Sequence, residues 1–88
     1  MITQTIVIQN RAGIHARPAA MLVQETKNFS ADIFFEKGND RINAKSIMGI
    51  ITLGAAYGSE IKLIADGNDE QAAITALVRL FESKFEEE

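Results

Sequence analysis

The single histidine of the chain stands where a glycine-containing loop is expected to enter a helix. Within residues 13–20 (GIHARPAA), His15 follows Gly13 by two positions and precedes Arg17 by two. Pro18 suits the first turn of a helix, where the N–H that proline lacks would have no partner within the helix. The N–H groups and the dipole of a helix start attract anions, and a guanidinium can bind phosphate oxygens. These residues therefore indicate an anion site.

The imidazole of His15 adds nucleophilic chemistry to this site. The pKa of an ordinary histidine is about 6.5, so much of the side chain is neutral, and therefore nucleophilic, near pH 7. His15 could thus accept a phosphoryl group and hold it. The alternative is that His15 only caps the start of the helix and binds nothing, and local spacing does not decide between the two.

Alternating apolar and polar residues predict four strands that would position this helix. The segments are residues 2–8, 31–36, 41–44 and 60–65. Residues 37–40 (KGND) favour a tight turn, so the two middle segments should form a β-hairpin. Ile64 is expected to face outward. Ile61, Leu63 and Ala65 are expected to face inward. In the earlier segments, Ile6 and Ile8 share one face, and Ala31, Ile33 and Phe35 share another.

Three helices are predicted, the first over residues 16–27, beginning at His15. Its inner stripe comprises Ala19, Leu22, Val23 and Thr26. The second runs from its cap Ser46 to Leu53, and Gly54 can end it. In the third, Asn68 and Gln71 have capping-box spacing. The stripe of this third helix comprises Ile74, Leu77, Val78, Phe81 and Phe85.

The resulting order, βαββαβα, predicts an α+β open-faced sandwich. In this fold a four-stranded antiparallel sheet is covered on one face by three helices. No repeat or linker interrupts the pattern, so one domain over residues 1–88 is expected. A domain of 88 residues can build one core but has little volume left for a deep cavity, so its function is expected at the surface.

The composition excludes several classes of protein. Nine Lys and Arg against twelve Asp and Glu give a net charge of -3, which argues against nucleic-acid binding through overall positive charge. The absence of cysteine and the single histidine leave no metal site or organic cofactor to expect. No signal peptide and no apolar run of ~20 residues is present, so we expect a cytoplasmic protein without membrane insertion. The negative charge gathers at Glu82, Glu86, Glu87 and Glu88.

Two motifs in register, residues 13–19 (GIHARPA) and 45–49 (KSIMG), resemble the HPr family. These are the histidine-containing phosphocarrier proteins of the bacterial phosphoenolpyruvate-dependent sugar phosphotransferase system. The resemblance spans the whole chain. It implies that His15 carries a phosphoryl group on Nδ1, received from phosphorylated enzyme I and passed to enzyme IIA domains of sugar permeases. It also implies that Arg17 positions the phosphoryl oxygens and that the partners supply the catalysis. Ala12 stands where members often carry Ser or Asn, which puts a side-chain contribution there in doubt.

Ser46 has two interpretations that can both hold. As the N-cap of the second helix it would contribute roughly 1 kcal/mol. The resemblance implies that an HPr kinase/phosphorylase modifies this serine in lineages with this motif, and that the phosphorylated protein can bind a transcriptional regulator as a corepressor. The added charge would be tolerated at a helix start and would act on docking.

The helix after Ser46 carries more apolar surface than one buried face requires. If Ile50 and Leu53 face the core, the other apolar residues are exposed, and such patches commonly mark binding sites. The alternative places Ile47 or Ile51 in the core. With one face of the first helix, this surface would ring His15 and form a docking surface. Its candidate residues are Ala16, Ala20, Met21, Gln24, Ile47, Met48 and Ile51.

The leading hypothesis is a monomeric phosphocarrier that docks transiently with enzyme I and enzyme IIA domains. A second is a mainly regulatory protein, either a corepressor phosphorylated on Ser46 or a nitrogen-type paralogue. Family members with only the regulatory role lack the active-site histidine, so His15 favours the carrier. A third, an unrelated α+β binding module, requires both motifs to be coincidences.

Overall fold

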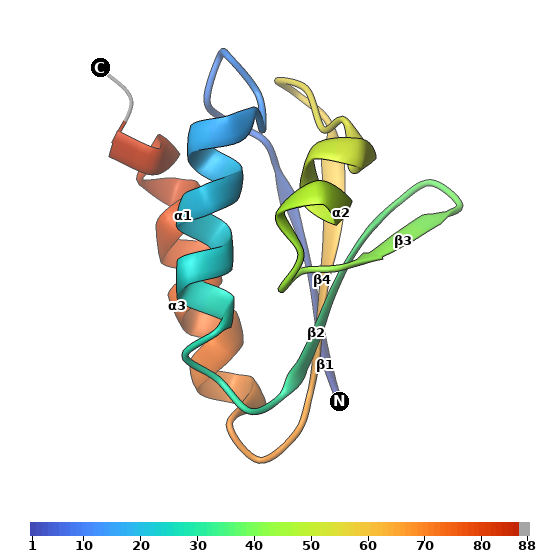
Figure 1. Cartoon of the computed structure of the whole chain (residues 1–88), viewed down its shortest axis with the longest axis vertical. Coiled ribbons are helices and arrows are strands. Elements are labelled where there is room, and N and C mark those ends of the chain that lie inside the picture. The colour runs from blue at the N-terminus through green and yellow to red at the C-terminus, as the bar shows by residue number, and fades with distance from the viewer. Residues whose placement is uncertain (87–88) are drawn as a thin grey trace.

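A computed structural model describes residues 1–86 and shows three helices packed on one face of a four-stranded sheet (Figure 1). The elements are β1 (Ile2–Val7), α1 (Ala16–Thr26), β2 (Asp32–Lys37), β3 (Asp40–Asn43), α2 (Ile47–Leu53), β4 (Glu60–Asp66) and α3 (Glu70–Glu82). A short turn, Lys84–Glu86, follows α3. The α+β open-faced sandwich with βαββαβα order is confirmed. Glu87 and Glu88 of the acidic end lie outside the described residues.

The sheet is antiparallel throughout, with the strand order β1-β4-β2-β3. β4 therefore lies inside the sheet, between the first two strands of the chain. Its alternation is as predicted, with Leu63 opposite Phe35 on the helix-covered face. Ile64 points to the helix-free face but is only 3% exposed, because it lies between its cross-strand neighbours Thr3 and Phe34 on a central strand.

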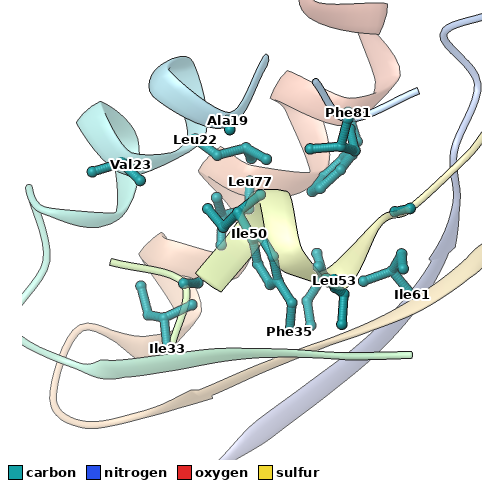
Figure 2. Packing of buried hydrophobic residues seen from close by; sticks show 14 of the residues in the cluster. Ala19, Leu22, Val23, Ile33, Phe35, Ile50, Leu53, Ile61, Leu77 and Phe81 are labelled. Carbon is teal, nitrogen blue, oxygen red and sulfur yellow. The ribbon is translucent and has the colours of Figure 1, made fainter. Parts of the chain in front are cut away.

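Side chains from the three helices meet the inner face of the sheet in one apolar cluster (Figure 2). The labelled members are Ala19, Leu22 and Val23 of α1, Ile50 and Leu53 of α2, Leu77 and Phe81 of α3, and Ile33, Phe35 and Ile61 of the sheet. Thr26 closes the stripe predicted for α1. It is fully buried, and its hydroxyl donates to the carbonyl of Ala44 at 2.8 Å, so its polar atom is satisfied.

The prediction of which residues cap the start of α3 is wrong. The helix begins at Glu70 with Asp69 as N-cap, so Asn68 and Gln71 do not form a capping box. The Asp69 carboxylate instead accepts hydrogen bonds from the backbone N–H groups of Ser30, at 2.8 Å, and Ala31, at 2.9 Å. These partners are remote in sequence, so local spacing does not reveal them. The carboxylate thus ties the start of α3 to the entry of β2.

The predicted end of α3 is also different. Phe85 is buried, as expected for the apolar stripe, but it is not helical, because α3 ends at Glu82. The Ser83 hydroxyl donates to the carbonyl of Leu80 at 2.7 Å, a local bond that competes with further helix. The three residues of the Lys84–Glu86 turn have φ between 55° and 59°, which is left-handed backbone. The chain therefore folds back and places the Phe85 ring 5.3 Å from that of Phe81.

Asp69 makes the free energy of unfolding depend on pH. The backbone N–H of Ser30, with that of Ala31, holds the pKa of the Asp69 carboxyl below its ordinary value of 3.8. This contribution to stability is present above the ordinary pKa and is lost as the pH falls through the lowered one. Asp69→Asn should lower the urea midpoint at neutral pH and weaken the decline of stability below about pH 4. The exposed Asp40→Asn is the control, and coincident profiles for Asp69→Asn and the parent chain would contradict this role.

Candidate functional site

The loop between β1 and α1 is closed by the side chain of Asn10. Asn10 is 2% exposed, and its Nδ2 donates to the carbonyl of Gly13 at 2.6 Å. The backbone N–H of Gly13 in turn donates to the carbonyl of Asn10 at 3.1 Å. Asn10 does not stand out in the sequence, because an asparagine in a loop does not by itself indicate a structural hydrogen bond. Two bonds between the same two residues fix the shape of this loop.

The loop is also held against the segment that follows α2. The N–H of Ile14 donates to the carbonyl of Ala55 at 2.9 Å, and the Ile14 side chain is buried. Gly13 has φ +73°, and a Cβ at this position would lie 2.9 Å from that same carbonyl oxygen. Both the backbone conformation and the close approach require glycine here. His15 directly follows the anchored Ile14 and is the N-cap residue of α1.

His15 is the N-cap residue of α1, as predicted, but its side chain makes no capping hydrogen bond. The cap is formed by its backbone, since the carbonyl of His15 accepts from the N–H of Ala19 at 2.9 Å. The imidazole is exposed at the end of the helix. The alternative in which the His15 side chain only caps the helix therefore does not describe this structure.

A small pocket of about 50 Å³ lies beside the imidazole. It is lined by Asn10, His15, Arg17, Pro18, Lys84 and Phe85. The N-cap residue His15 and Arg17 of the first turn of α1 thus line one pocket, as expected for the anion site. Residue spacing does not reveal Lys84, which lines the pocket because a left-handed turn follows α3. Figure 1 shows this turn at the same end of the molecule as the start of α1. The exposed Ala12 is not part of the lining.

Ser46 is confirmed as the N-cap of α2. Its half-buried hydroxyl accepts from the N–H of Gly49 at 3.0 Å. Gly54, with φ +67°, ends the helix in the left-handed conformation, as predicted. Only this far end of α2 leads to Ala55 and the loop before His15, so the structure does not bring Ser46 into the His15 pocket.

The exposed side of α2 is apolar. Ile50 and Leu53 are in the core, whereas Ile47, Met48 and Ile51 are 41%, 69% and 37% exposed. The alternative that placed Ile47 or Ile51 in the core is therefore wrong. On the neighbouring α1, the predicted residues are accessible as well: Ala16 and Gln24 are exposed, and Ala20 and Met21 are half-buried.

Two other properties of the described residues bear on the kind of site. Within residues 1–86, no group of three or more His, Cys, Asp and Glu side chains could hold a metal ion. None of the helices in this same part of the chain combines the length and apolar character needed to cross a membrane.

Comparisons with known proteins agree with the fold and the motifs. A family model described as "PTS HPr component phosphorylation site" matches residues 2–83. The chain is 49% identical to phosphocarrier protein HPr of Treponema pallidum over all of both chains. Crystallised HPr of Thermoanaerobacter tengcongensis superposes with a TM-score of 0.96 at 56% identity, covering 100% of this chain and 99% of that one. The catabolite repression protein Crh of Bacillus subtilis, solved as a swapped dimer, gives a TM-score of 0.75 at 43% identity, covering 94% and 95%.

A methyl group at residue 13 should disturb the loop that carries His15. Gly13→Ala should lower the free energy of unfolding by about 1–3 kcal/mol, because it adds a backbone clash to an unfavourable φ. Gly38→Ala is a matched control, since Gly38 has φ +60° but nothing within 4 Å of a Cβ. Urea unfolding should show the larger loss for Gly13→Ala, and the NMR signals of His15 should shift only in that variant. Equal losses would contradict the close packing of this loop.

Proposed function

The chain belongs to the HPr family of the phosphotransferase system, and we propose that His15 accepts a phosphoryl group from phosphorylated enzyme I and passes it to enzyme IIA domains of sugar permeases. One observation carries this proposal: the imidazole of His15 is exposed at the start of α1, makes no capping bond and shares a pocket with Arg17. A neutral imidazole free of other bonds can act as a nucleophile. Members of the family are carriers, and their partners supply the transferase activity.

The transfer exchanges one phosphorus–nitrogen bond for another. The lone pair of His15 Nδ1, the nitrogen used in the family, forms the new bond to phosphorus while the bond to the donor nitrogen breaks. The electron pair of the broken bond stays on the donor. Arg17 and the first-turn N–H groups of α1 offset the charge of the phosphoryl oxygens. The reverse exchange then passes the group to an enzyme IIA domain.

The exposed faces of α1 and α2 are the proposed docking surface for these partners. Ile47, Met48 and Ile51 present apolar side chains on α2, and methionine adapts to partners of different shape. Ala16, Ala20, Met21 and Gln24 extend the surface along α1 from His15. A partner that covers this surface would bring its own reacting group to the imidazole.

Phosphorylation of Ser46 is the proposed regulatory step. The hydroxyl is half-buried at the start of α2, directly before the exposed Ile47 and Met48. A phosphate would bring about -1.5 to -2 charges to the border of the docking surface while remaining compatible with the helix start. The position of Ser46 favours a second function, in which HPr kinase/phosphorylase modifies the protein and the phosphorylated form binds a transcriptional regulator. The similarity to Crh, a catabolite repression protein of Bacillus subtilis, supports the same function.

The remaining parts of the proposal concern assembly and location. We propose that residues 1–88 form one HPr-like domain, because a single apolar cluster joins the sheet and the helices, and that this domain acts as a monomer. We place it in the cytoplasm, as the lack of cysteine suits a reducing compartment. The mechanism needs no metal or organic cofactor, no nucleic acid and no membrane insertion.

Phosphorylation by enzyme I tests the carrier function. Incubation with enzyme I and phosphoenolpyruvate should add one acid-labile phosphate, detected by intact mass spectrometry. His15→Ala should not be modified, because the accepting nitrogen is gone. Arg17→Ala should be modified about 100-fold more slowly, since one charged donor to the transferring group is lost. An unmodified parent chain, or modification that survives in His15→Ala, would contradict the proposal.

Modification by HPr kinase/phosphorylase and ATP tests the regulatory step. The enzyme should add one acid-stable phosphate to the parent chain and none to Ser46→Ala, a variant that loses only about 1 kcal/mol as a cap. The phosphorylated protein should then accept phosphate from enzyme I at least about tenfold more slowly, because charge repulsion at the docking surface opposes the encounter. Equal rates would remove the regulatory role while leaving the carrier function in place.

A further inference from the structure

The turn after α3 is anchored firmly against the core. Phe85 is 2% exposed, and its ring meets Phe81 edge-on at 5.3 Å. Phe81 in turn meets Phe35 of β2 at 5.9 Å, again edge-on. A row of three rings therefore leads from the centre of the sheet to the wall of the His15 pocket. Burial of Phe85 fixes the position of its neighbour, Lys84.

Backbone bonds hold the same turn. The N–H of Glu86 donates to the carbonyl of Ser83 at 2.9 Å, and the N–H of Ser83 donates to the carbonyl of Arg79 at 2.9 Å. Left-handed backbone at three successive non-glycine residues persists only where surrounding structure holds it. The result is that Lys84, which is far from His15 in sequence, lines the same pocket.

Lys84 has no ion-pair partner among the described residues. No ion pair joins it to a carboxylate within residues 1–86, whereas the ammonium of Lys62 lies 3.6 Å from Glu36. None of the residues that line the pocket is acidic. Lys84 is also exposed, and its long, flexible side chain carries a charge that a group bound at the imidazole could meet. Two residues with cationic side chains, Arg17 and Lys84, therefore line the pocket that contains the imidazole of His15.

We propose that Lys84 contacts the phosphoryl group on His15 and stabilises the phosphorylated state of this chain. The inference rests on the proposed carrier function and adds a residue to it. Arg17 can bind two phosphoryl oxygens through its planar guanidinium, and the ammonium of Lys84 supplies a point charge from the opposite, C-terminal part of the chain. Because the phosphoryl group is strongly anionic, a cation beside it shifts the equilibrium of transfer toward phosphorylated His15.

An equilibrium between two carriers separates this role from docking. The parent chain and Lys84→Met are mixed in equal amounts with a trace of enzyme I and a limiting supply of phosphoenolpyruvate. Enzyme I then only catalyses exchange, so the final partition depends on the stability of each phosphohistidine and not on the encounter rate. Methionine keeps the length of the side chain and removes its charge. The two chains differ in mass, so intact mass spectrometry gives the phosphorylated fraction of each.

The partition constant should favour the parent chain by about fivefold, the factor for one unit-charge attraction across ~4 Å of water. Lys84→Arg, which keeps the charge, should partition equally with the parent. Lys27→Met is the matched control, because Lys27 is exposed at the opposite end of α1 and should have no effect. Equal partition for Lys84→Met, or an equal shift for Lys27→Met, overturns the role of Lys84 while the carrier function stands. Absence of phosphate on the parent chain overturns the carrier function itself.

Discussion

Packing of Phe81 between Phe35 and Phe85 ties the sheet, the last helix and the His15 end of the molecule into one core. Each edge-on aromatic pair contributes about 0.5–1.5 kcal/mol beyond the area that it buries. Left-handed backbone costs about 1–2 kcal/mol per residue, so the Lys84–Glu86 turn depends on the burial of Phe85. Because Phe85 also lines the pocket beside His15, the candidate site is supported directly by the core.

The surroundings of His15 combine a fixed backbone with adaptable side chains. Asn10 and Gly13 close the loop before α1, and the hydrogen bond from the N–H of Ile14 to the carbonyl of Ala55 holds this loop against the segment that follows α2. The exposed side chains on the outer face of α2, by contrast, include the flexible Met48. A fixed backbone at His15 within an adaptable surface suits a carrier that has to dock several partners in one geometry. A small domain can achieve this without a deep cavity.

Residue spacing predicted the features that depend on near neighbours in the chain. The period of α2 separated buried Ile50 from its exposed neighbours, and the Ser46 cap involves a partner three residues away. The features that it missed depend on distant partners. Asp69 binds backbone groups 38 and 39 residues earlier, and Lys84 reaches His15 only because the chain reverses after α3. Phe85 keeps the helical spacing of apolar residues although α3 ends at Glu82, so the spacing alone does not show where the helix ends.

The position of β4 inside the sheet has a consequence for biosynthesis. All the strand pairing of β1 is with β4, and β2 needs the same strand on its inner side. A nascent chain that has exposed only its N-terminal half can form the β2–β3 hairpin but cannot place β1 in the sheet. The helices would then lack the apolar face on which they pack. Assembly of the sheet therefore waits until β4, which ends at Asp66, has left the ribosome.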